Sequence, residues 1–197
     1  ADDSIGSVLI MASRGGLKTS AVQAAIIQSI LRDPDIAIMV YMETRQQAVR
    51  MVRTVKSQFE RNSILREVFG DWVPRKQKNE DGGSSKFVWT DSEFIVSRRQ
   101  DFSAKDPTLA AGGTDVTITG GHYHKIFIDD PTSWQQAMSA DQMKKAILGY
   151  EQLVPILNPG GRFVVTCTPY DELDLSHHLR GAVAEEFKSI ILDCGME

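Results

Sequence analysis

Lys18 and Thr19 follow an apolar segment and open a predicted helix, a position at which these residue types bind phosphate. Residues 8–12 are apolar, residues 13–17 include two adjacent glycines, and helical spacing begins after them. In such a loop, backbone N–H groups and the positive end of the helix dipole face the phosphates, and the lysine reaches the β- and γ-phosphates. The threonine hydroxyl is a Mg²⁺ ligand in loops of this kind. The segment therefore predicts a phosphate-binding loop.

This loop departs from the full pattern at two positions. Ala12 and Leu17 stand where the pattern has glycine, six residues before the lysine and immediately before it. Gly15 and Gly16 are left to supply the unusual backbone angles that a loop around a phosphate needs. An ordinary strand–turn–helix is the alternative interpretation. The residues that we expect to contact a nucleotide are Ser13, Arg14, Gly15, Gly16, Leu17, Lys18, Thr19 and Ser20.

Asp129 and Asp130 end a second apolar segment, predicted as a strand over residues 125–129. Ligands of open α/β sheets bind at the carboxyl ends of the strands, so Asp129 is placed to hold Mg²⁺ through water. Asp130 would orient and activate an attacking water. Most ATPases of this kind have Glu at the second position, and Asp is one methylene shorter. A strand followed by an Asp-Asp-Pro turn is the alternative, but the spacing of about 110 residues from Lys18 favours an ATPase.

A third segment, residues 162–168, predicts a buried strand that ends in polar side chains. Thr166 and Thr168 flank Cys167, and Pro169 follows. In a parallel sheet these hydroxyls would lie beside the nucleotide edge, where Thr168 could sense the γ-phosphate. Taken alone, the segment is better explained as a strand that proline terminates.

The remaining pattern alternates between strands and helices, which predicts an α/β fold with a mainly parallel central sheet flanked by helices. Asp91 and Ser92 are expected to turn an added β-hairpin over residues 86–97, and residues 74–86 form one long polar segment, which we expect to be mobile. A further strand is predicted over residues 36–42, and helices are predicted over residues 19–32, 44–62, 63–69 and 141–153.

Composition indicates one globular domain over residues 1–197, with 42% hydrophobic and 24% charged residues. The chain leads into its first strand within a few residues, so we interpret it as a piece of a longer protein. No apolar run is long enough to cross a membrane. The net charge of −4 means that any DNA contact requires a local basic patch or an assembly. Cys167 and Cys194 lie in apolar runs, which favours reduced, buried thiols.

The three motifs together resemble the ATPase domain of the large terminase subunit of tailed bacteriophages and viruses, the motor that packages double-stranded DNA into procapsids. Residues 13–19, 119–131 and 166–170 carry the resemblance, which covers residues 8 to about 180. It implies an ASCE-type P-loop NTPase fold that binds ATP and Mg²⁺. The nuclease domain that follows in the family is not visible in this sequence.

By this resemblance, Lys18, Arg14 and Asp130 would be catalytic, and Thr19 and Asp129 would bind the metal. Thr166, Cys167 and Thr168 would form the motif that couples hydrolysis to domain movement. Some relatives offer an arginine to the neighbouring subunit's nucleotide from a segment where this chain has Thr119 and His122. We therefore expect such an arginine to come from elsewhere, with Arg98 and Arg99 as candidates.

The resemblance also implies partners and a location. These are double-stranded DNA, the portal of the procapsid, the small terminase subunit and further copies of the chain in a ring on the capsid, in the host cell cytoplasm and without a membrane. In isolation we expect a monomer with weak ATP hydrolysis. Two alternatives remain open: a helicase-like nucleic-acid ATPase, and a nucleotide-binding assembly module that no longer hydrolyses.

Other side chains suggest weaker hypotheses. His122 and His124 would share one side of a strand as phosphate or surface contacts, whereas His177 and His178 are typical surface residues. Two basic clusters, Arg98-Arg99 and Arg75-Lys76-Lys78, could touch a DNA backbone or be solvated charge.

Overall fold

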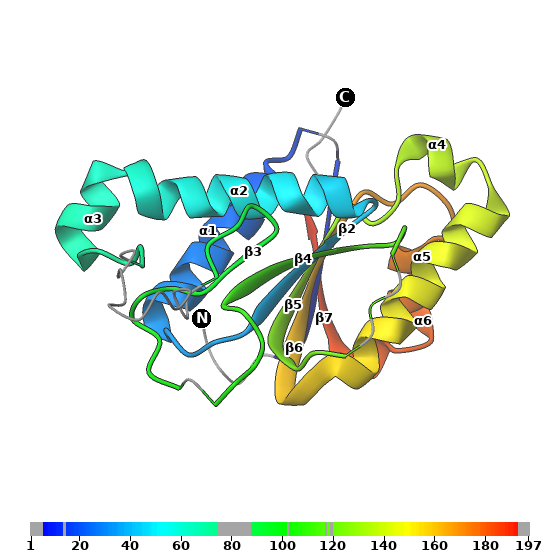
Figure 1. The fold of residues 1–197 in the computed structure, drawn as a ribbon. Coiled ribbons are helices and arrows are strands. Elements are labelled where there is room, and N and C mark those ends of the chain that lie inside the picture. The colour runs from blue at the N-terminus through cyan, green and yellow to red at the C-terminus, as the bar shows by residue number, and fades with distance from the viewer. Residues whose placement is uncertain are drawn as a thin grey trace.

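A seven-stranded sheet lies between two layers of helices in the computed structural model of the chain (Figure 1). The structure describes residues 6–13, 15–74, 88–101, 103–116, 118 and 120–192. The strands are β1 (Ser7–Ala12), β2 (Ile38–Met42), β3 (Glu93–Phe94), β4 (Leu109–Gly113), β5 (Tyr123–Asp129), β6 (Leu157–Cys167) and β7 (Phe187–Leu192). The helices are α1 (Lys18–Arg32), α2 (Arg45–Arg61), α3 (Ser63–Phe69), α4 (Trp134–Ala137), α5 (Ala140–Leu153) and α6 (Leu175–Gly181), with 3₁₀ turns at Val154–Ile156 and Ala184–Glu186.

The strand order of the sheet is β3-β4-β2-β5-β6-β1-β7. Every pairing is parallel except that of the short β3 with β4. β6 therefore lies between β1, which leads into the predicted phosphate loop, and β5, which carries the acidic pair. In this register Asp129 of β5 is opposite Thr166 of β6, and Met11 of β1 is opposite Cys167. The three predicted motifs consequently reach one edge of the sheet together.

Alternation along the strands divides the core into two layers. Ile38, Val40 and Phe127 face α1 and α2, whereas Ile126 and Ile128 face α5 and α6. Figure 1 shows α1 and α2 on one side of the sheet and α5 and α6 on the other. Because both faces are covered, β2 and the middle parts of β5 (residues 126–128) and β6 (residues 163–165) are apolar on both sides, as expected for parallel strands.

α2 is fixed at its N-terminus by a capping box. Thr44 Oγ1 accepts a hydrogen bond from Gln47 N at 3.3 Å, and Gln47 Oε1 accepts one from Thr44 N at 3.2 Å. The helix begins close against β4, where a Cβ added to Gly113 would lie 2.1 Å from Arg45 N. A larger residue than glycine would therefore push the start of α2 away from the sheet.

Most predicted elements are confirmed, with boundary shifts of a few residues. Helices α1, α2, α3 and α5 and strands β1, β2, β5 and β6 lie where the sequence indicates. The predicted hairpin is reduced to hydrogen bonds from Thr90 N to Glu93 O and from Ile95 N to Val88 O, and its second strand pairs mainly with β4. Residues 75–87, which include most of the long polar segment and the Arg75-Lys76-Lys78 cluster, lie outside the described residues.

The prediction missed β4 and β7. The sequence of β4 is Leu-Ala-Ala-Gly-Gly, which has low intrinsic strand propensity and is held in the sheet by its neighbours. β7 is an edge strand that pairs with β1 alone. No helix among the described residues is both long enough and apolar enough to span a membrane.

Phe59 provides a test of the helical layer that holds α2. The side chain is fully buried and lies 6.1 Å from the ring of Trp72 and 6.2 Å from that of Phe94. We expect Phe59→Ala to lower the free energy of unfolding by about 3–5 kcal/mol, because it leaves a cavity among these rings. Urea denaturation followed by circular dichroism measures the change. The control is Phe69→Ala on α3, where the ring is 46% exposed and the loss should be well under half as large.

Candidate nucleotide-binding site

Lys18 is a buried cation at the C-terminal edge of the sheet. It is 6% exposed, and its ammonium group donates hydrogen bonds to Ala12 O at 2.9 Å, Ser13 O at 3.1 Å and Thr168 Oγ1 at 2.9 Å. Asp130 Oδ1 lies 3.9 Å from the same nitrogen. The lysine thus joins the end of β1 to the segments that follow β5 and β6. These are the three motifs that the sequence predicts to meet.

Two described residues of the loop between β1 and α1 have positive φ angles. Gly15 has φ +84°, and Leu17, directly before the lysine, has φ +54°. Both angles are left-handed, and a leucine there is strained by about 1–3 kcal/mol. The Leu17 side chain is 75% exposed, so packing does not repay this strain. The chain therefore adopts the glycine conformation at a position where it lacks the glycine.

Asp129 is fully buried at the end of β5. One carboxylate oxygen, Oδ1, accepts a hydrogen bond of 2.5 Å from Thr166 Oγ1 on the neighbouring strand. Among the described residues, no group donates to the other oxygen, Oδ2. A buried carboxylate oxygen without a donor is an unfavourable arrangement that a cation would relieve. Asp129 therefore fits the role of Mg²⁺ ligand.

A metal site made of protein groups alone is absent, since no three His, Cys, Asp or Glu side chains gather as metal ligands in the described part of the chain. Mg²⁺ takes one or two carboxylates together with substrate phosphates and water. Thr19 and Ser20 lie exposed on the first turn of α1, where a hydroxyl can reach a metal bound to phosphate.

Asp130 adopts a left-handed conformation directly after β5, with φ +42°. Its backbone N–H donates to Thr166 O at 2.9 Å, which holds this turn against the end of β6. The side chain is 40% exposed, so water can approach the carboxylate while Lys18 lies on its other side. A strained residue whose carboxylate is open to water is suited to hold an attacking water.

Cys167 is buried at the end of β6 between the two threonines. Burial, and to a lesser extent the charges of Asp174 and Asp130, raise the pKa of its thiol to about 12. At neutral pH the group is therefore a neutral thiol, neither a nucleophile nor a metal ligand. Its place in the site is structural, as part of the strand end that positions Thr166 and Thr168.

Glu43 is a site residue that the sequence analysis missed. It follows β2, and because Met42 is paired with Asp129, it emerges at the same edge as the acidic pair. Its carboxylate accepts hydrogen bonds from Ser133 Oγ at 2.8 Å and from Gln47 Nε2 at 3.2 Å. A single acidic residue after an apolar strand was the available signal. Glu43 links the start of α2 to the segment that follows Asp130.

The predicted candidates for an arginine offered in trans lie at the opposite edge of the sheet, where the parallel strands begin. Arg99 is buried and donates to Asp106 O at 2.6 Å, and the following backbone groups donate to Asp35, just before β2. Arg98 is exposed and stacks over the Trp72 ring at 4.9 Å. Of the two, Arg98 is the one that a neighbouring molecule can reach.

Several other predicted residues are placed as follows. His122 N donates to Asp106 Oδ2, and His124 Nδ1 accepts from Ala37 N, both at the edge away from Lys18, so neither contacts the candidate phosphate site. Arg14, Thr119 and Cys194 lie outside the described residues.

The fold of this chain is similar to that of solved proteins. The chain matches a Dbp5 variant from S. cerevisiae, solved with Nup159, a Gle1 variant, IP6 and ADP, with a TM-score of 0.54 and 11% identity over 95% of this chain and 44% of that one. A DEAD box protein from Methanococcus jannaschii matches with a TM-score of 0.52 and 12% identity over 94% of this chain and 45% of that one. The fold of this chain is therefore similar to the fold of part of each of these two proteins.

This chain spans less than half the length of those two solved chains, and at such identities the likeness concerns the fold alone. No protein-family model matches the sequence, and no curated protein does. The chemistry must therefore be argued from the site itself.

Thr166 tests the arrangement of the acidic strand. We expect Thr166→Val to reduce the free energy of unfolding by about 1–3 kcal/mol, because the buried Asp129 carboxylate loses its donor. Urea denaturation measures this loss, and Thr54→Val, an exposed change of the same kind, is the control. Equal stability of the two variants would mean that Thr166 does not hold the carboxylate.

Proposed function

We propose that this chain is a Mg²⁺-dependent ATPase domain whose active site lies at the C-terminal edge of the sheet. The observation that carries the proposal is the convergence on Lys18 of the loop after β1, the acidic turn after β5 and Thr168 after β6. A buried lysine with backbone carbonyls and a hydroxyl as partners can exchange them for phosphate oxygens. One of the two solved proteins with a similar fold was solved with ADP, which supports a nucleotide as the ligand.

The residues divide the work of hydrolysis between them. Lys18 would turn its N–H donors from the carbonyls of Ala12 and Ser13 to the β- and γ-phosphates. Asp129 and Thr19 would hold Mg²⁺, which when bound neutralises charge on the phosphate oxygens. Asp130 would accept a proton from water as the water oxygen bonds to the γ-phosphorus. The bond from that phosphorus to the bridging oxygen breaks, and ADP leaves.

Thr166 and Thr168 would link this chemistry to movement. Thr166 bonds Asp129 through its side chain and Asp130 through its carbonyl, whereas Thr168 bonds Lys18. A γ-phosphate would take the place of Thr168 on the lysine, and its loss would restore that contact. The loop after β6 therefore has two sets of partners, one for each nucleotide state.

More specifically, we propose that the ATPase drives double-stranded DNA into procapsids as the motor domain of a large terminase subunit. The support is the sequence resemblance in residues 13–19, 119–131 and 166–170. On this proposal the chain acts in a ring at the portal, with the small subunit as a further partner, and Arg14 and an arginine from a neighbouring copy complete the phosphate contacts.

A helicase-like nucleic-acid ATPase is the second candidate, because the fold matches DEAD box proteins. The two functions differ in the nucleic acid that stimulates hydrolysis. Stimulation by duplex DNA supports the packaging motor, whereas stimulation by single strands alone supports the helicase-like ATPase.

Lys18→Ala tests nucleotide binding. We expect the affinity for a fluorescent ATP analogue with Mg²⁺ to fall at least about 100-fold, because each lost hydrogen bond to a charged group is worth about 1.5–3 kcal/mol. Fluorescence anisotropy measures the affinity. The matched control is Lys144→Ala on the exposed face of α5, which should bind as the unchanged chain does. Normal binding by the Lys18 variant would remove the phosphate-loop assignment.

Asp130→Asn separates hydrolysis from binding. We expect turnover to fall by about 10²–10⁴-fold while the analogue still binds, because the amide cannot take the proton from water. Turnover of the unchanged chain should rise more than linearly with protein concentration if a neighbouring copy completes the site. Asp141→Asn, an exposed change on α5, is the control. Binding by the unchanged chain without turnover at any concentration would instead indicate a non-hydrolysing module.

A further inference from the structure

The outer face of α2 concentrates positive charge in an acidic chain. The helix has five basic residues and one acidic residue, a net charge of +4, whereas the whole chain has −4. The basic residues are Arg45, Arg50, Arg53, Lys56 and Arg61, and all except Lys56 are exposed. No other motif or site described above uses them.

Four of the side chains on this face form a straight polar stripe. Arg50, Thr54, Ser57 and Arg61 follow one another at intervals of four, three and four residues, which places them on one line along a helix. Among the described residues, no carboxylate pairs with Arg50 or Arg61. The stripe therefore offers the Ser57 hydroxyl between two guanidinium groups that have no carboxylate partner in the described part of the chain. The Thr54 hydroxyl instead donates to Arg50 O at 3.0 Å.

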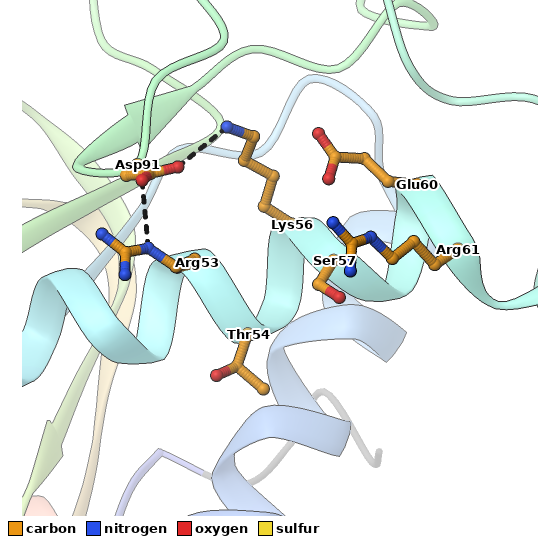
Figure 2. Close-up of a pocket in the computed structure, with 7 residues that line it drawn as sticks. All are labelled: Arg53, Thr54, Lys56, Ser57, Glu60, Arg61 and Asp91. Carbon is orange, nitrogen blue, oxygen red and sulfur yellow. Dashed lines mark hydrogen bonds and ion pairs between the residues drawn. The ribbon is translucent and has the colours of Figure 1, made fainter.

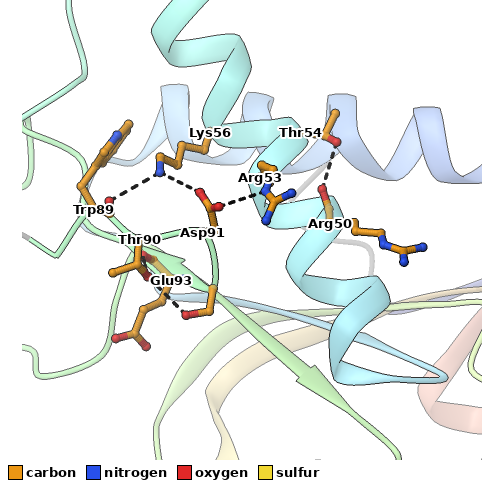
Figure 3. A network of polar contacts seen from close by, with 9 residues as sticks. Arg50, Arg53, Thr54, Lys56, Trp89, Thr90, Asp91 and Glu93 are labelled. Atoms are coloured by element: carbon orange, nitrogen blue, oxygen red, sulfur yellow. Dashed lines mark hydrogen bonds and ion pairs between the residues drawn. The ribbon is translucent and has the colours of Figure 1, made fainter.

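A surface hollow of about 640 Å³ includes part of the stripe, and it is lined by Arg53, Thr54, Lys56, Ser57, Glu60, Arg61 and Asp91. Figure 2 shows Arg53 and Lys56 pointing toward Asp91, whereas Thr54 and Ser57 point away from it. Both ion pairs with Asp91 measure 3.0 Å. Asp91 thus neutralises part of the charge on one side of the helix, and Arg50 points away from this network (Figure 3).

Glu60, the one acidic residue of α2, does not lie on the stripe. Glu60 Oε1 accepts a hydrogen bond of 2.8 Å from Trp89 Nε1. The same indole lies beneath the Lys56 ammonium, 5.9 Å from the ring centre. The nearest aromatic ring is therefore occupied by contacts within the chain. Surfaces that bind single strands combine basic groups with aromatic rings on which bases stack, and this stripe contains no aromatic residue.

We infer that the α2 stripe, Arg50 to Arg61, binds the phosphate backbone of duplex DNA. Eleven residues of helix separate the two arginines by about 16 Å, comparable to the roughly 12 Å width of the major groove. The two guanidinium groups can therefore reach phosphates on opposite sides of that groove, with the Ser57 hydroxyl as an additional donor. The packaging role rests on the proposed function, whereas the charge surface itself does not depend on nucleotide hydrolysis.

The test compares duplex binding by the unchanged chain and by Arg50→Gln/Arg61→Gln, using a fluorescein-labelled 30-base-pair duplex over a series of salt concentrations. Each lost phosphate contact lowers the slope of log K against log salt by about 0.9. We expect the double variant to lose about 1.8 from the slope and about 10–100-fold in affinity near 0.1 M salt. The control Lys144→Gln/Lys145→Gln removes the same charge from two exposed positions on α5. It should change the salt slope and the duplex affinity less than the Arg50/Arg61 variant does.

Asp91→Asn provides a second test, in which the duplex affinity should rise. A folding defect would lower this affinity and so cannot produce the same result. Removal of this carboxylate frees Arg53 and Lys56 beside the stripe, so duplex affinity should rise several-fold. Three results would each overturn the inference. The Arg50/Arg61 variant could bind the duplex as tightly as the unchanged chain, or the α5 control could lose as much affinity as that variant. The unchanged chain could also bind a single strand more tightly than the duplex.

The ATP analogue separates this inference from the proposed function. The Arg50/Arg61 variant should bind the analogue normally, and Lys18→Ala should bind the duplex normally. A chain that binds the duplex through α2 without binding the nucleotide would keep this inference and remove the ATPase.

Discussion

A cation that is almost fully buried must be surrounded by acceptors, and the site is organised around this requirement at Lys18. Its hydrogen-bond acceptors come from the ends of β1 and β6, and Asp130 after β5 lies 3.9 Å away, so the lysine is satisfied only if those strand ends meet. The strand ends lie close together because β6 is placed between β1 and β5 in the sheet. The arrangement is also easily changed, because a phosphate offers the same ammonium better acceptors than two carbonyls and a hydroxyl.

Strain at this edge is confined to residues beside the candidate phosphate site. Among the described residues, the non-glycine residues with positive φ are Leu17 and Asp130, one before the lysine and one after the acidic strand. Such conformations persist when the surroundings determine them. For Asp130 the determinant is visible in the hydrogen bond from its N–H to Thr166 O. Leu17 has the weaker support, which identifies it as the least favourable point of the loop.

The sequence predicted which strand ends meet better than it predicted the full set of strands in the sheet. Apolar runs that end in Lys-Thr, Asp-Asp or Thr-Cys-Thr combine a buried strand with polar groups at its end, and parallel pairing brings such ends together. β4 gave no such signal, since alanine and glycine carry no strand pattern and its place is determined by packing against α2. Glu43 was missed for a related reason, because its importance follows from the pairing of β2 with β5 and not from neighbours in sequence.

Glu43 also connects the acidic turn after β5 to the start of α2, although the two segments are far apart in sequence. Its carboxylate bonds Gln47 in the cap of α2 and Ser133, three residues after Asp130. A shift of the acidic turn must therefore carry this carboxylate with it or break a hydrogen bond at the start of α2. α2 is closely packed on β4, so such a shift would act on the whole helix, including its outer basic face. Glu43 and the N-terminal cap of α2 are therefore the element through which the acidic turn and this basic face would be coupled.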